Sequence, residues 1–341
     1  MKQFVNFVLV TFLVFASGVM WAEEANPASD FVYDLNEEGT GVVIKKYKGK
    51  AVDVVIPSVI EDFPVVNCNL SENETIVSVV LPDTCTQFKF YGCKSLEKVT
   101  FPKYLKYLPG KIGGYYYGEY RYYNEYRYYN EDRYDDGYYM YDKMDVGVFQ
   151  LCTALKEITL PQGLERIGCG AFGNSGLESI VIPDSVQSIE YGAFSGCTAL
   201  TSVTIGNGVQ SIENGAFSGC TALTTVTMGN SVQRIGYSAF IGCIALTSVT
   251  IGNGVQSIGE YAFDGCTALT SITIGNSVQS IGDGAFSHCS SLTTFNIGVE
   301  QVKYKYNRTL DNYYPRHFVG CSSLSLKEKA KIKKTGYTGS F

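Results

Sequence analysis

Apolar residues recur in a fixed order along most of this chain, at spacings typical of short strands. In the unit from 200 to 220, two short runs alternate apolar and polar residues, and a Gly206-Asn207 turn separates them. A short helical turn and an Ala-Phe pair follow the second run. The inward positions of this unit are Leu200, Val203, Ile205, Val209, Ile212, Ala216, Phe217 and Cys220. The pattern predicts two extended segments and one tight corner in each unit.

The unit repeats with a period of 23 residues, which the motif Phe-x-x-Cys marks. Close copies begin at Phe194, Phe217, Phe240, Phe263 and Phe286. Diverged copies begin at Phe90, Phe149, Phe172 and Phe318. A single unit cannot bury its apolar face, whereas stacked units share one continuous core. The period therefore predicts a solenoid of about nine coils, with parallel pairing between strands of neighbouring coils.

The repeat Leu-Thr-Ser-Val-Thr-Ile-Gly-Asn-x-Val-Gln-x-Ile-x-x-x-Ala-Phe-x-x-Cys resembles the BspA-like family of leucine-rich repeats. The resemblance covers roughly residues 54–326. It implies a right-handed, β-rich superhelix, classed by convention as α/β, on exported bacterial surface proteins often linked to adhesion. This chain has glycine, for example Gly206 and Gly229, where the family more often has proline. The motif residues of the family are structural, so the resemblance supplies no ligand-binding residue.

The two ends of the chain depart from the repeat. Residues 1–22 combine Lys2 with an apolar run and a small-residue zone before Ala22, which predicts a cleaved signal peptide and export. No other apolar run is long enough to span a bilayer. Residues 23–66 form the expected N-terminal cap, a hairpin around Gly39, and the solenoid covers 67–326. A short basic helix from Leu326 to Lys334, within a cap or tail at 327–341, ends the stack.

Two coils are longer than the period, and both excesses fall just before the Phe. The first insertion, 113–148, carries 13 of the 26 tyrosines and a duplicated Glu-Tyr-Arg-Tyr-Tyr-Asn segment. The second lies near 303–312. Insertions at one phase of a solenoid emerge on one side. Tyrosine and arginine suit recognition surfaces, although slippage of a short repeat would produce the same segment without any ligand.

Composition narrows the chemistry. Charged residues make up 18% of the chain, and the net charge is −6. The first insertion has eight acidic and four basic residues. This negative charge disfavours nucleic acid as a partner. The two histidines, His288 and His317, have no partner at catalytic or metal-ligand spacing, and His288 occupies a variable surface position. We therefore expect no enzyme activity, no catalytic residue, no metal site and no cofactor.

The remaining repeated positions are cysteines and hydroxyl residues. Eight of the eleven cysteines share one coil position, where we expect buried small side chains and not disulfides, while Cys68 and Cys85 are a candidate bridge. The outward strand positions form a grid of Ser and Thr on an expected concave face. This grid is either an ordinary solvated sheet face or a hydrogen-bonding surface for glycan or extended protein.

We hypothesise an exported protein, secreted, cell-surface or periplasmic, that binds a protein partner on host matrix or another cell. The alternatives are a structural envelope protein and a glycan-binding module. The candidate contact residues are Tyr116, Tyr120, Arg121, Tyr122, Tyr126, Arg127, Tyr128 and Arg133 of the first insertion, Tyr304, Tyr306, Tyr313 and Tyr314 near the second, and Thr204, Thr227, Thr250 and Thr273 of the repeat face.

Overall fold

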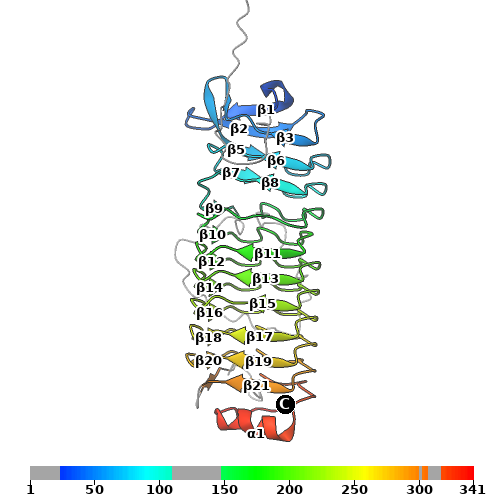
Figure 1. Ribbon diagram of the computed structural model, residues 1–341, viewed down its shortest axis with the longest axis vertical. Helices are drawn as coiled ribbons and strands as arrows, with labels where there is room; N and C mark the ends of the chain where they lie inside the picture. Colours follow the sequence, from blue (N-terminus) through cyan, green and yellow to red (C-terminus); the bar gives the residue numbers. More distant parts are fainter. Residues whose placement is uncertain (1–23, 110–146, 299–301, 306–315) are drawn as a thin grey trace, which may run out of the picture.

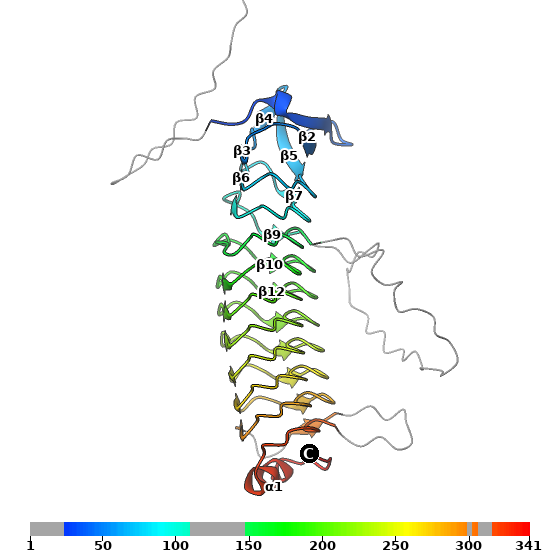
Figure 2. The same ribbon diagram turned by 90° about the vertical axis from the view of Figure 1, so that its right-hand side faces the viewer.

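The protein is a right-handed parallel solenoid of about ten turns with a repeat of about 23 residues. A computed structural model describes residues 24–109, 147–298, 302–305 and 316–341, which form one column that is nearly straight in both views (Figures 1 and 2). The sequence predicted about nine coils. The extra turn is the first, where Leu70 replaces the phenylalanine: Cys93 Sγ donates to Leu70 O as later cysteines do to phenylalanine carbonyls.

The N-terminal cap is the predicted hairpin. Strands β1 (Phe31–Leu35) and β2 (Val42–Tyr47) pair antiparallel after the short helix η1 (Ala28–Asp30). Strand β2 then pairs in parallel with β5 (Phe63–Asn69), which also pairs with β4 (Val59–Ile60) and β7 (Gln87–Lys89). The hairpin therefore covers a sheet edge that an open stack would expose.

The first extended segment of each turn builds one side of the column. The early turns contribute β3 (Asp53–Val55), β6 (Ser78–Val80) and β8 (Lys98–Thr100), and the later turns β11 (Ser179–Ile182), β13 (Ser202–Ile205), β15 (Thr225–Thr227), β17 (Ser248–Ile251), β19 (Ser271–Ile274) and β21 (Thr294–Ile297). Pairing is parallel and joins equivalent repeat positions, as in Val203↔Val226. Each turn therefore repeats the strand of its neighbour, with equivalent residues side by side.

The second extended segment builds an eight-stranded sheet of short strands. Its members are β9 (Tyr107–Leu108), β10 (Arg166–Ile167), β12 (Ser188–Ile189), β14 (Ser211–Ile212), β16 (Arg234–Ile235), β18 (Ser257–Ile258), β20 (Ser280–Ile281) and β22 (Lys303–Tyr304). The turn between the two segments is tightly stacked. A Cβ on Gly229 would lie 2.3 Å from Gly206 O, so glycine at this corner permits the close approach of two turns.

Phenylalanine rings stack through the centre of the column. The rings from Phe90 to Phe318 lie with neighbouring centroids 5.0–5.7 Å apart and are fully buried. Each ring covers the ring of the turn below, and the Phe backbone N–H bonds to the next turn, as from Phe217 N to Ala239 O at 2.8 Å. The core is therefore continuous from turn to turn.

The cysteines of the repeat are buried thiols, as expected. Cys220 Sγ donates to Phe194 O at 3.2 Å, and Cys243 Sγ to Phe217 O at 3.3 Å, so each thiol ties its turn to the preceding one. Cys68 and Cys85, the candidate bridge, are both free thiols. Burial raises the pKa of Cys243 to about 12, which keeps this thiol protonated and unreactive at neutral pH.

The C-terminal helix α1 (Leu326–Lys334) has the predicted bounds and closes the other end. Ser325 caps it by accepting from Glu328 N. Glu328 Oε1 accepts from Phe295 N at 2.9 Å, and Lys331 Nζ donates to Phe295 O at 3.0 Å. These bonds satisfy backbone groups at the free edge of β21, so α1 is a structural cap.

Two expected insertion boundaries need correction. Val148 was assigned to the first insertion, but it is buried and its carbonyl accepts from Phe90 N at 2.8 Å, because it fills the alanine position before Phe149. The second insertion was expected near 303–312, but Lys303–Tyr304 are strand β22. The predicted signal peptide and most of both insertions lie outside the described residues.

Replacing Phe240 by alanine is expected to lower the free energy of unfolding by about 3–5 kcal/mol, because it opens a cavity between two stacked rings. Urea unfolding followed by circular dichroism measures the loss. Thr250→Ala, on the exposed face of β17, is the control and should cost under about 1 kcal/mol. Equal losses in the two variants would contradict the proposed role of the ring stack.

Candidate interaction surfaces

The two insertions are attached to the same side of the column. The described chain reaches 109 just after β9 and 305 just after β22, and these strands are the two ends of the eight-stranded sheet. They hold equivalent repeat positions, roughly 34 Å apart at the parallel-strand spacing. The described flanks thus agree with the expected common side. The candidate residues from Tyr116 to Arg133, and Tyr306, Tyr313 and Tyr314, lie outside the described residues.

The turns between these attachment points expose tyrosines at the same phase. Tyr191 is 39% exposed and Tyr237 is 50% exposed, at the same repeat position two turns apart. Tyr261 packs edge-on against Tyr237, with ring centroids 5.8 Å apart. Sequence reasoning missed these residues because they are scattered along the chain. They follow the second strand of their turns, where the insertions also begin, and this shared position could have indicated them in the sequence.

Ion pairs between adjacent turns flank the tyrosines. Arg166 pairs with Glu190, and Arg234 pairs with Glu213. Arg166 lies on β10 and Glu190 follows β12. Arg234 lies on β16 and Glu213 follows β14. We call the surface formed by Tyr191, Tyr237, Glu190, Glu213 and Arg234 the insertion-side strip. It combines aromatic area with fixed charges.

Tyr304 lies in the C-terminal cap, away from the insertion-side strip. Its ring contacts His317 and Tyr337, both at 5.2 Å between centroids, and its hydroxyl is 2.7 Å from Thr335 Oγ1. Burial raises the pKa of Tyr304 to about 12. These contacts give Tyr304 a packing role that the sequence did not predict.

The threonine row has the predicted geometry on the six-stranded sheet. Thr204, Thr227, Thr250 and Thr273 are exposed, and strand register pairs Thr204 with Thr227 and Thr250 with Thr273. The column is nearly straight, so the row is closer to a flat strip than to the expected concave face (Figure 2). A neighbouring column of threonines forms hydrogen bonds between turns, because Thr224 Oγ1 donates to Thr201 O at 3.0 Å.

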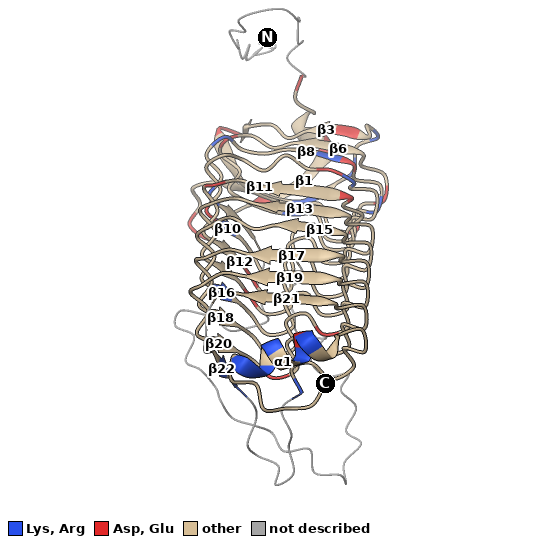
Figure 3. Ribbon diagram, turned by 60° about the horizontal axis from the view of Figure 1, so that its bottom comes forward, with Lys and Arg blue, Asp and Glu red and all other residues tan. Residues whose placement is uncertain are grey.

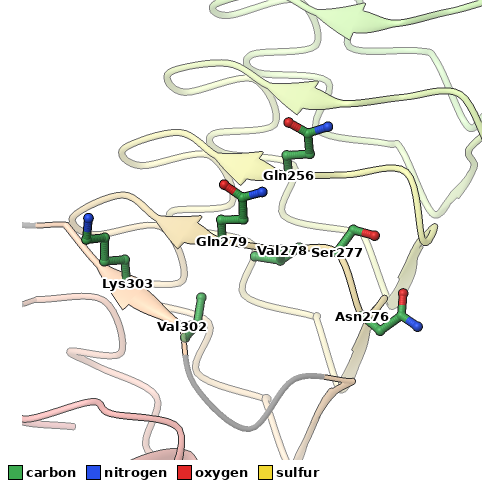
Figure 4. Close-up of a pocket in the computed structure, with 7 residues that line it drawn as sticks. All are labelled: Gln256, Asn276, Ser277, Val278, Gln279, Val302 and Lys303. Carbon is green, nitrogen blue, oxygen red and sulfur yellow. The ribbon is translucent and has the colours of Figure 1, made fainter.

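A shallow groove runs beside the eight-stranded sheet. Its two adjoining parts have volumes of about 740 and 500 Å³ and share Gln256 and Ser277. Figure 4 shows Gln256 and Gln279 projecting side by side from successive turns, with Asn276 on the neighbouring corner. The lining residues are Gly208, Gln210, Asn230, Ser231, Gln233, Asn253, Gly254, Gln256, Asn276, Ser277, Val278, Gln279, Val302 and Lys303. We call this surface the amide groove.

The amide groove is polar and almost uncharged. The side-chain amides of its glutamines form no hydrogen bond with another described residue, so they can both donate to and accept from a ligand. The asparagines are partly used, because Asn253 Oδ1 accepts from Asn276 N at 3.2 Å. Among the described residues that line it, Lys303 at the C-terminal end is the one that carries a charge. The groove suits a neutral ligand rich in hydroxyl or amide groups.

The histidines have partners that spacing did not reveal. His288 is exposed, as predicted, but its Nδ1 lies 2.7 Å from Asp264 Oδ1. His317 is fully buried, because it fills the alanine position before Phe318. Its Nε2 donates to Lys305 O at 3.0 Å, and its Nδ1 lies 3.9 Å from Asp283 Oδ1. Both histidines were expected to be isolated, and stacking of turns brings each beside a carboxylate.

The described residues contain no group of three or more His, Cys, Asp or Glu that could hold a metal ion. Among the same residues, no helix is both long enough and apolar enough to cross a bilayer.

The family of the protein follows from the repeat. Residues 65–112, 141–246 and 233–327 match the BspA type leucine rich repeat region, in six copies. The chain belongs to this family. The match covers more than half of the sequence and includes the turns in which phenylalanine stacking and register are most regular. No curated protein matches the chain.

Several solved structures are similar. A leucine-rich repeat protein of T. pallidum is 23% identical, with 93% of this chain and 99% of that chain covered and a TM-score of 0.46. One from Bacteroides ovatus is 20% identical, covering 86% and 80%, with a TM-score of 0.49. A leucine rich cell surface protein of Faecalibacterium prausnitzii is 21% identical, covering 84% and 96%, with a TM-score of 0.28.

Acid is expected to destabilise the C-terminal cap through His317. Burial lowers the pKa of His317, against an opposing effect of Asp283. Between this lowered pKa and about pH 6.5, the unfolded chain therefore binds more protons at this residue than the folded protein does. The free energy of unfolding should fall with decreasing pH, by at most about 1.4 kcal/mol per pH unit from this residue.

Urea unfolding between about pH 7.5 and pH 5.5 tests this, with His317→Gln as the matched variant that keeps an amide donor but does not titrate. Burial also raises the pKa of the nearby Glu260, which acts with the opposite sign in both proteins. The difference in slope between the two proteins isolates His317. Parallel pH profiles would contradict the assignment.

Proposed function

We propose that this protein is an exported adhesin-like binding protein that recognises a protein partner through its insertion side. The observation that carries the proposal is the attachment of both tyrosine-bearing insertions to equivalent strands, β9 and β22, of one sheet. A single partner can therefore contact both insertions and the turns between them. The exposed Tyr191 and Tyr237 of the insertion-side strip support this choice of side.

The side chains of the first insertion and of the insertion-side strip suit a protein partner. Tyrosine offers a large contact area and a hydroxyl while losing little side-chain entropy on binding. Arginine adds bidentate hydrogen bonds and stacking, which Arg121, Arg127 and Arg133 supply in the first insertion. Such residues dominate the binding energy of protein interfaces. Export is proposed from residues 1–22, whose pattern is that of a signal peptide.

Deleting residues 110–146 and joining the ends with a short Gly-Ser linker should leave the column folded and weaken partner binding at least tenfold. Gly147 and Val148 stay, because Val148 is part of the core. Binding to immobilised matrix proteins and to bacterial surface extracts is measured by biolayer interferometry. Tyr191→Ala/Tyr237→Ala is the point-mutant arm, and Thr204→Ala/Thr250→Ala on the opposite sheet is its control.

Unchanged binding by both the deletion and the tyrosine variant would reject the insertion side as the contact surface. Weaker binding by the threonine control alone would move the site to the row of Thr204, Thr227, Thr250 and Thr273. A structural envelope component would instead co-purify with envelope fractions and give no signal with either the matrix proteins or the surface extracts.

The amide groove supports a second candidate function, the binding of a neutral glycan chain. Sugar hydroxyls both donate and accept, and the repeated glutamine amides offer the same capacity in successive turns. The near absence of charge gives no attraction for an anionic polymer. In this candidate the glycan binds the amide groove, whereas in the hypothesis from the sequence it binds the threonine row on the six-stranded sheet.

A neutral-glycan array distinguishes the two faces. Gln233→Arg/Gln256→Arg should abolish glycan binding if the amide groove is the site, because long charged side chains fill the groove. Thr227→Arg/Thr250→Arg is the matched change on the other sheet and should leave binding intact. The reverse result would assign the glycan to the threonine row, and no array signal would reject this candidate.

A further inference from the structure

Positive charge is concentrated at the C-terminal end of the column. Residues 316–341 contain six basic residues and one acidic residue, while the whole chain has a net charge of −6. Figure 3 shows the lysines gathered on α1, below central turns that carry few charged residues, whereas the turns near the N-terminal cap carry charges of both signs. The other end differs, because residues 30–50 contain four acidic and four basic residues. The two ends of the protein therefore carry different electrostatic character.

The lysines of α1 are divided between two faces. Ile332 is buried and Glu328 bonds to β21, so these residues mark the inner face. At 3.6 residues per turn, the opposite face contains Leu326, Lys327, Ala330, Lys333 and Lys334, which we call the cap face. All five are exposed, Leu326 at 87%. An apolar strip of Leu326 and Ala330 is thus flanked by lysines.

The demands of helix capping do not account for this composition. Lys331 donates to Phe295 O at the edge of β21. Lys333 and Lys334 lie in the last turn, where the helix dipole favours positive charge. Lys327 lies in the first turn, where the dipole disfavours a cation. An exposed leucine at the start of a capping helix also gains nothing from burial.

The position of α1 makes the cap face accessible to a flat surface. The helix lies across the end of the column, roughly perpendicular to its long axis, with no described turn beyond it (Figures 1 and 3). Lysines along such a helix can approach a plane together. A cluster of lysines on one helix is attracted to the negative potential of an anionic lipid surface.

We propose that the cap face docks on a membrane surface that contains anionic phospholipid. Lys327, Lys333 and Lys334 contact phosphate and carboxylate groups, and Leu326 enters the headgroup region. The column then stands with its C-terminal end on the membrane and its insertion side exposed to partners. This docking is independent of the adhesin proposal, since it uses another surface and another ligand.

Co-sedimentation with vesicles tests the proposal, using the chain from residue 24 onward. Vesicles of phosphatidylcholine with about one-quarter phosphatidylserine should bind the protein, and pure phosphatidylcholine vesicles should not. Each lysine near an anionic surface contributes about a fivefold gain in partitioning, so Lys327→Gln/Lys333→Gln should bind about 25-fold more weakly. Binding should also fall as salt is raised.

The matched control is Lys45→Gln/Lys46→Gln, which removes the same charge from β2 at the opposite end. It should bind like the unmodified protein. Leu326→Ser should weaken binding without changing its salt dependence. Circular dichroism and urea midpoints confirm that the variants fold.

Three results would overturn the proposal. They are no binding to the anionic vesicles, an equal loss in the Lys45/Lys46 control, and binding to soluble heparin without binding to vesicles. The last result would assign the cap face to a soluble polyanion.

Discussion

Each turn of this protein is completed by its neighbour. A phenylalanine ring is buried only when the rings of the adjacent turns cover it, and the N–H beside that ring bonds to a carbonyl of the next turn. The cysteine thiol adds a bond to the preceding turn. An isolated turn would leave all of these groups exposed to water or unpaired. Stacking in register is therefore the condition for every other feature of the structure.

This dependence between neighbours explains why variation is confined to a few phases of the repeat. The corner after the second strand tolerates change, since one phase of it holds the exposed Tyr191 and Tyr237 and the buried Asp283. The insertions begin there, and Tyr191 and Tyr237 lie at the same phase. The ends of the column are the other free positions. They need caps, and a cap helix has an outer face that the core does not constrain, which is where the lysines and Leu326 lie.

The repeat allowed much of the fold to be predicted, including the hairpin of β1 and β2, the parallel ladders, the thiol column and the bounds of α1. The errors arose where a residue type hid its repeat position. Leu70 fills a phenylalanine position, while Val148 and His317 fill alanine positions. The register of the turns places each of these side chains in the core. Tyr304 was predicted near the second insertion, but it pairs with Ile281 in the sheet and its ring packs against Tyr337 of the C-terminal cap.

The sequence by itself determined the period, the inward residues and the low number of charged residues in the central turns, because these depend only on local spacing and composition. Tertiary structure decided which residues of different turns meet. Asp264 approaches His288, Asp283 approaches His317, and glutamines 23 residues apart line one groove, because stacking places each turn about one strand spacing from the next. It also decided which face of α1 is free, since that depends on where the helix meets β21. Contacts across turns are set by register and packing, and spacing within one turn cannot specify them.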